Sequence, residues 1–282
     1  MRLSETSLRS LCAGSLLAFG LVCGAAAAPL VVTALDGGYT ADGQWYAHNL
    51  TTGGTAQIAA SAPGAGPLPG GAARLETTAD NDSRAAIAIR NSYGTVSGIL
   101  SQLQLQYSFL KVGPTAGIAE AAPALRLLFE GTGGQKLTLI YEPYWNQAGH
   151  EGTSQPVTTN TWQTAAIDYT HGLFWSSGGD GGAFGAANSS GGPPLMTLSD
   201  WSAFITDAAF DAASLTQITL ALGSYNPSQI GYVDDVRIAA GTAFAAVQYD
   251  FEARAAQVPE PGSLALLGLG LAGLAYLRRR RA

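Results

Sequence analysis

The residues best suited to chemistry stand together near the middle of the chain. Three aromatic side chains, two amides and one acid occur within seven positions: Tyr141, Glu142, Tyr144, Trp145, Asn146 and Gln147. Sugars present apolar C–H faces and polar rims, so aromatic faces beside hydrogen-bonding groups suit a carbohydrate ligand. The stretch therefore predicts a binding site formed by Tyr141, Glu142, Tyr144, Trp145 and Asn146. The alternative is that Tyr141 and Trp145 pack in the core or hold a loop.

Signals for catalysis are weak. The three histidines, His48, His150 and His171, have no metal-ligand spacing, and no Gly-x-Ser-x-Gly elbow is present. The glycine cluster at 178–182 is not followed by the Lys-Ser/Thr of a phosphate-binding loop. Glu142 and Glu151 could form an acid pair for glycoside cleavage. We expect a protein that is not an enzyme, with a secreted glycoside hydrolase as one alternative.

Short strands must position these residues. Period-two alternation is clearest at 103–112, where Leu103, Leu105 and Tyr107 share one face and Gln104 and Gln106 share the other. Strands are predicted at 30–34, 44–49, 56–60, 73–77, 85–90, 103–112, 124–130, 136–142, 162–169, 215–223, 229–238 and 244–251. Loops are predicted at 61–71 and 176–194, and one helix at 198–213, with Ser199 or Asp200 as its N-cap. This pattern predicts an all-β, jelly-roll-like β-sandwich over residues 29–253.

Composition narrows the function classes. Residues 29–257 contain eight Lys and Arg and eighteen Asp and Glu, which gives this segment a formal charge of about −10. Nucleic acid requires a basic surface, so a nucleic-acid partner is not expected. The only cysteines, Cys12 and Cys23, lie near the N-terminus. The middle of the chain therefore has no disulfide, thiolate nucleophile or cysteine metal ligand.

Three segments resemble jelly-roll carbohydrate-binding modules. They are the Trp-Gln-Thr segment at 160–169, the closing segment 220–238 with its Asp234-Asp235 pair, and the opening segment 35–45, which lacks the usual Phe-Glu. The resemblance implies a structural Ca²⁺ held by Asp36, Asp234 and Asp235, because Ca²⁺ takes six to eight oxygen ligands. The alternative is that Asp234 caps a turn and Asp235 is solvated.

The N-terminal segment has the organisation of a signal peptide. Arg2 and Arg9 form a basic region, an apolar run follows at 11–22, and small residues at 24–28 suit signal peptidase. Residues 1–28 are therefore predicted to be the signal-peptide segment, and the cut is expected after Ala27.

The C-terminal segment has three parts. Pro259, Glu260 and Pro261 precede an uncharged run at 263–277, and a basic tail closes the chain with Arg278, Arg279, Arg280 and Arg281. The run is shorter than the roughly 20 residues that usually span a bilayer, and the arginines would stay on the cytoplasmic side. This tail resembles a PEP-CTERM sorting signal of Gram-negative bacteria, and residues 254–282 are assigned to a linker followed by that signal. The resemblance implies a single transmembrane helix at 263–277 and cleavage by an exosortase near Pro259.

Together these features predict an exported protein of the cell envelope, cell surface or extracellular matrix. The leading hypothesis is a non-catalytic protein that binds extracellular polysaccharide. The main alternative is a structural or adhesive protein without a small ligand. Before processing, the C-terminal helix would hold the protein in the membrane.

Overall fold

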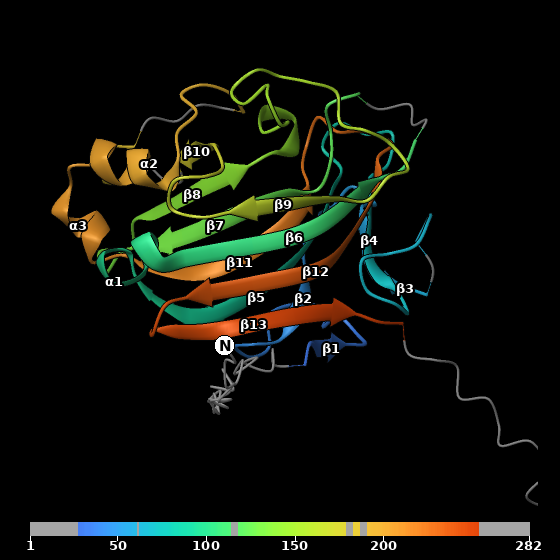
Figure 1. Cartoon of the computed structure of the whole chain (residues 1–282), viewed down its shortest axis with the longest axis horizontal. Helices are drawn as coiled ribbons and strands as arrows, with labels where there is room; N and C mark the ends of the chain where they lie inside the picture. The colour runs from blue at the N-terminus through green and yellow to red at the C-terminus, as the bar shows by residue number, and fades with distance from the viewer. Residues whose placement is uncertain (1–27, 61, 114–117, 179–182, 187–190, 254–282) are drawn as a thin grey trace, which may run out of the picture.

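The computed structural model describes residues 28–60, 62–113, 118–178, 183–186 and 191–253. They form two β-sheets packed face to face, which confirms the predicted jelly-roll-like sandwich (Figure 1). The predictions for 1–27 and 254–282, including the transmembrane helix, lie outside this range. Within the described residues no helix is long and apolar enough to cross a membrane.

The first sheet has seven strands and lies at the front in Figure 1. Its central strand, β12, pairs with β6 along one edge and with β4 and then β13 along the other. Outside these lie β9 next to β6, β3 next to β4, and β1, which runs parallel to β13. The bounds are β1 (Leu30–Val32), β3 (Thr55–Ala59), β4 (Ala72–Glu76), β6 (Leu103–Lys111), β9 (Gln163–Ile167), β12 (Ile230–Ala240) and β13 (Phe244–Phe251).

The second sheet has six antiparallel strands in the order β10-β8-β7-β11-β5-β2. Its bounds are β2 (Trp45–Thr51), β5 (Arg84–Thr95), β7 (Ala124–Glu130), β8 (Lys136–Tyr141), β10 (Phe174–Gly178) and β11 (Ser214–Leu222). β7 and β8 form a hairpin across residues 131–134. Strand β10 was not predicted, because its residues 176–178 were assigned to a glycine-rich loop.

Short helices cover one end of the sandwich (Figure 1). They are α1 (Val96–Ile99), α2 (Leu198–Phe204) and α3 (Ala208–Asp211), with 3₁₀ turns η1 (Leu100–Gln102), η2 (Pro143–Trp145) and η3 (Ala183–Gly185). The single helix predicted at 198–213 is therefore two. Its predicted N-cap was wrong by two or three residues: Thr197 caps α2 and forms a capping box with Asp200.

The core lies between the sheets and follows the strand alternation. In β6 the side chains of Leu103, Leu105 and Tyr107 face inward and are almost fully buried, while Gln104 is exposed. Tyr107 also donates its hydroxyl to the carbonyl of Pro123 at 2.9 Å, which satisfies a polar group in an apolar interior. The outward-facing residues of β6 are thus free to form a surface site.

Strand β12 contains a bulge where its neighbour changes from β4 to β13. Its pairing with β6 shifts between Asp234 and Arg237, and Asp235 has a positive φ of 48°. The buried Asp234 carboxylate accepts backbone N–H groups from Phe251 at 3.1 Å and Leu68 at 3.3 Å. Asp234 thereby joins β12 to the end of β13 and to the loop that precedes β4. It does so at the bulge, where the partner of β12 changes from β4 to β13.

Candidate binding groove

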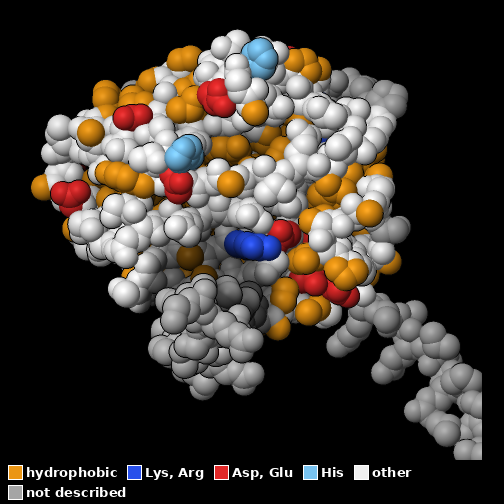
Figure 2. All heavy atoms as spheres, in the orientation of Figure 1, with side chains coloured by type: hydrophobic (Ala, Val, Ile, Leu, Met, Phe, Trp, Pro, Cys, Tyr) orange, Lys and Arg blue, Asp and Glu red, His pale blue; other side chains and the backbone are white. Residues whose placement is uncertain are grey.

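A groove of about 640 Å³ lies on the outer face of the first sheet, over β9, β6, β12 and β13. Figure 2 looks onto this face, where charged side chains are sparse. Small side chains from three strands keep the groove shallow and open: Ala166, Ala239 and Ala246. Longer polar side chains stand beside them. The volume lies within the range of about 300–1,000 Å³ that ligand pockets usually have.

Four residues stand side by side across the groove. Strand register aligns Ala166 of β9 with Gln106 of β6, Gln106 with Arg237 of β12, and Arg237 with Gln248 of β13. We call Gln106, Arg237 and Gln248 the polar row. Since alternate residues of a strand share a face, Gln104 lies on the same surface two positions from Gln106.

The Asp235 carboxylate holds the polar row in place. It accepts Gln106 Nε2 at 3.0 Å, Gln248 Nε2 at 2.6 Å and Arg237 Nε at 3.0 Å. Three side chains from three strands are therefore oriented by one buried acid. The positive φ of Asp235 costs about 1 kcal/mol, which the surrounding bonds offset. A network of this kind fixes side-chain positions before any ligand arrives.

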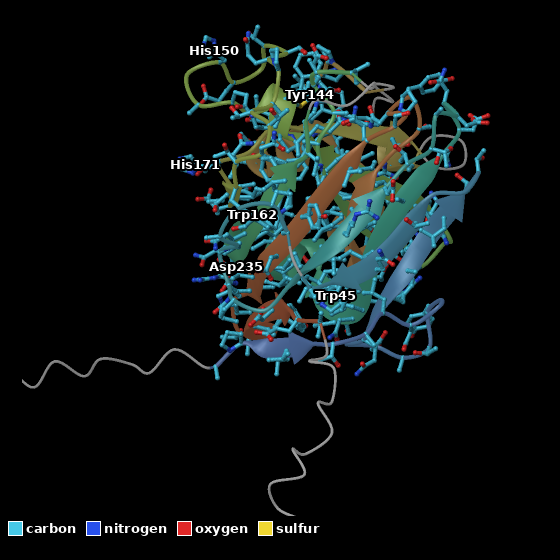
Figure 3. All side chains as sticks on the ribbon, turned by 90° about the vertical axis from the view of Figure 1, so that its right-hand side faces the viewer. Trp45, Tyr144, His150, Trp162, His171 and Asp235 are labelled. Carbon is cyan, nitrogen blue, oxygen red and sulfur yellow. The ribbon has the colours of Figure 1, made fainter. Side chains whose placement is uncertain are left out.

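The turn after β9 forms one rim of the groove. Asp168 accepts the backbone N–H groups of Thr170 and His171, and its Oδ2 lies 2.9 Å from His171 Nδ1. Burial opposes ionisation of Asp168, but hydrogen bonds from the Thr170 backbone and the His171 side chain outweigh it and lower its pKa to about 2. The exposed His171 ring stands on the same outer side of the sandwich as Asp235 (Figure 3).

The predicted aromatic stretch lies elsewhere, at the end of β8 and in η2 (Figure 3). Tyr141 is buried in the core, where its ring packs edge-on against Phe174. Tyr144 and Trp145 both donate to the carbonyl of Gly191 at 3.2 Å. Their contacts join the loop around residue 191 to η2. That these aromatic side chains bind sugar stays a prediction.

The polar members of that stretch are engaged within the protein. Asn146 bonds the carbonyls of Glu142 and Leu173 and accepts the Leu173 N–H at 2.7 Å. Glu142 accepts Trp175 Nε1 at 2.9 Å. Burial raises the pKa of Glu142, and the hydrogen bond from Trp175 and the charge of Arg126 oppose that shift only in part. Glu151, the other acid of the suggested pair, lies in an exposed loop.

The predicted calcium ligands are not brought together. Among the described residues no group of three or more His, Cys, Asp or Glu side chains could hold a metal ion. Asp36 bridges to Tyr46 and accepts the Thr40 hydroxyl. The carboxylate oxygens that Ca²⁺ would use already accept N–H donors: Asp234 from two backbone groups, and Asp235 from the Arg237 cation. The residues at these positions do not fit a calcium ion.

The groove residues were missed as a site in the sequence. Gln104 and Gln106 were placed on the polar face of their strand, and that face is the groove surface. Arg237 and Gln248 show the same alternation in the last two strands. The signal that could have found them is a polar residue at matching positions of several strands, which requires the strand order.

Comparison with curated proteins found no match. Among solved structures, the chain is similar to a family 11 carbohydrate-binding module from Clostridium thermocellum in complex with a β-1,3-1,4-mixed-linked tetrasaccharide, at 12% identity and a TM-score of 0.40, covering 79% of this chain and 97% of that one. An endo-β-1,4-glucuronan lyase from Trichoderma reesei is similar at 11% identity and a TM-score of 0.38, covering 70% and 92%. Similarity of this size transfers neither a ligand nor a reaction.

The C-terminal segment gives a firmer result. The model of the PEP-CTERM protein-sorting motif matches residues 257–281, which include the Pro-Glu-Pro, the apolar run and the four arginines. The match confirms the resemblance drawn from those residues. Residues 257–281 are a PEP-CTERM protein-sorting motif, and the chain is that of an exported protein handled at the cell envelope.

Proposed function

We propose that this protein is released to the cell surface or extracellular matrix by exosortase processing, and that it binds polysaccharide there without cleaving it. The observation that supports the proposal is the polar row, oriented by Asp235 beside a floor of alanines. Amide and guanidinium groups that are already in place can bond sugar hydroxyls with little loss of side-chain entropy.

The polar row favours a neutral chain. Arg237 is paired with Asp235, so its charge is compensated before binding. The two glutamine amides each offer a donor and an acceptor, which matches the hydroxyl groups of a neutral sugar. The groove lies on the surface of the sheet and is not an enclosed cavity, so a polysaccharide could enter it from the side without a chain end.

The experiment is a pull-down with matrix polysaccharide, supported by a glycan array. Ala166→Trp should fill the groove and reduce binding at least tenfold, because the exposed Ala166 side chain stands in line with the polar row. Ala212→Trp is the matched control, since Ala212 is exposed beside α3 and lines no part of the groove.

Three outcomes oppose the proposal. Equal binding by Ala166→Trp and the control would place any sugar site outside the groove. Concentration-dependent self-association without affinity for any glycan would instead support a structural or adhesive protein. Turnover of a glycan in the same assay would contradict the non-catalytic part.

A further inference from the structure

A second, smaller pocket lies on the outer face of the other sheet. It measures about 140 Å³ and spans β2, β5, β11 and β7. Ala86 and Ala221, which are directly paired between β5 and β11, lie among its lining residues. Their small side chains leave a depression that is surrounded by larger polar residues: His48, Arg84, Arg126, Gln217 and Thr219.

Two arginines in this pocket lack a partner. Of the seven Lys and Arg in the described residues, four form ion pairs and one donates to two carbonyls; these are Arg74, Arg90, Lys136, Arg237 and Lys111. Within the part of the chain that the structure describes, Arg84 and Arg126 make neither an ion pair nor a hydrogen bond. Both line the same pocket.

Arg126 is buried, so the lack of an ion-pair or hydrogen-bond partner for its guanidinium group is energetically unfavourable. Its Nε is buried without a hydrogen bond. Burial lowers the pKa of Arg126, the Glu142 carboxylate opposes that shift, and the charge of Arg84 adds to it. Glu142 lies outside ion-pair distance and accepts from Trp175 instead. A buried charge is normally paired, so two neighbouring guanidinium groups without a carboxylate indicate a site for an anion.

The hydrogen bonds among the other lining groups leave one hydroxyl proton for a ligand. Tyr46 donates its hydroxyl to Gln217 Oε1 at 2.9 Å, so the Gln217 amide nitrogen points toward Thr219 Oγ1 at 2.9 Å and His48 Nε2 at 3.3 Å. Thr219 Oγ1 accepts that bond and keeps its own proton for a ligand. His48 lies half-buried beside these groups, and burial followed by the Arg126 charge lowers its pKa.

We propose that this pocket binds an oxyanion, a sulfate or a carboxylate group, between Arg84 and Arg126. Its volume of about 140 Å³ has room for a few water molecules, which is enough for an oxyanion. Planar guanidinium groups bond such oxygens in pairs. The anion is either a free inorganic ion or an acidic substituent on a glycan. The site is separate from the groove and does not depend on it.

Isothermal titration calorimetry on the purified full chain tests the proposal. Sodium sulfate, glucuronate and glucose are titrated separately, with sodium chloride holding ionic strength constant. Arg84→Met and Arg126→Met should each weaken sulfate binding about 10- to 100-fold, since a charge-assisted hydrogen bond contributes about 1.5–3 kcal/mol. Arg74→Met makes the same charge change outside the pocket and should leave binding unchanged.

The arms distinguish the sources of the anion. Sulfate binding without glucuronate binding supports a free inorganic ion, and binding of both supports an acidic glycan substituent. Arg126→Met should also raise the melting temperature in sulfate-free buffer, because it removes an unpaired buried charge. If Arg126→Met does not fold, Arg84→Met decides alone. Absence of saturable binding by sulfate and glucuronate, or equal binding by the pocket variants and wild type, overturns the proposal.

Discussion

Asp235 Oδ1 accepts Gln248 Nε2 at 2.6 Å, a bond that joins the bulge of β12 to the outer face of β13. The other oxygen of the same carboxylate accepts Gln106 Nε2 from β6 at 3.0 Å. One acid therefore sets the orientation of two amides that belong to neighbouring strands on either side of it. The shape of the groove depends on this arrangement.

Asp235→Asn should weaken polysaccharide binding about tenfold. The amide replaces one acceptor with a donor, so Gln106 and Gln248 can no longer both be held. Asparagine tolerates the positive φ, so the backbone should be retained. Stability should fall by about 1 kcal/mol in urea denaturation. Asp82→Asn, in an exposed turn, is the control, and equal binding by both variants would show that the row does not contact the ligand.

Trp145→Ala should leave polysaccharide binding unchanged. The Trp145 ring packs against Tyr144 and its Nε1 donates to Gly191, so its removal should cost about 1–2 kcal/mol of stability. Pull-down and urea denaturation of the same preparation separate the two effects. If Trp145→Ala lost binding without losing stability, the sugar site would lie at the aromatic stretch and not in the groove.

Stability should fall as the pH rises from about 4 to 6. Burial raises the pKa of Asp234 and of Asp250 to about 6, and the two carboxylates lie close enough for the charge of Asp250 to raise the pKa of Asp234. The native state then binds more protons than the unfolded state in that window, so ionisation favours unfolding. Urea denaturation across pH 4–8 measures the slope.

Asp250→Asn should reduce that slope. The buried Asp250 Oδ1 has no hydrogen-bond partner in the described structure, so neutralising the group should stabilise the protein by about 1 kcal/mol at pH 8. Glu76→Gln removes a charge from the exposed end of β4 and is the control. A wild-type stability that is flat or rises over this range would contradict the assigned ionisation of the pair.

A chelator should leave the melting temperature unchanged. The carboxylates of Asp234 and Asp235 are occupied by N–H donors, and a bound ion would otherwise stabilise the fold in proportion to the logarithm of its concentration. Thermal melts with EDTA and with added calcium make the comparison. A higher melting temperature in calcium would contradict the absence of a calcium site. The variant Asp250→Asn would then test whether Asp250 is one of the calcium ligands.

Alternation made the strands predictable. Each of the twelve predicted strands corresponds to a strand of the structure, since one face of each sheet packs on a single core. β10 escaped because its residues 176–178 are two serines and a glycine, and its position is set by pairing with β8. The helix at 198–213 divides after Phe204, where Ile205 adopts an extended backbone as the C-cap of α2.

The site was less predictable than the fold because it depends on neighbours distant in sequence. Gln106 and Gln248 are 142 positions apart and meet only through β12. The aromatic stretch looked more suited to sugar because its residues are adjacent. In the structure Tyr141 faces the core, as the alternative reading allowed. A calcium site was expected at Asp234 and Asp235, and in the structure both carboxylates accept N–H donors.

Strand β13 connects the groove to the C-terminal segment and could carry mechanical force between them. It carries Gln248 of the groove, it is the last strand before the sorting segment, and its final residues pair with β1, where Glu252 donates its N–H to Val32. Tension between a polysaccharide in the groove and a tether beyond residue 253 would run along this strand. Its ladders with β12 and β1 would then be strained together in shear, so slippage would require many hydrogen bonds to break at once.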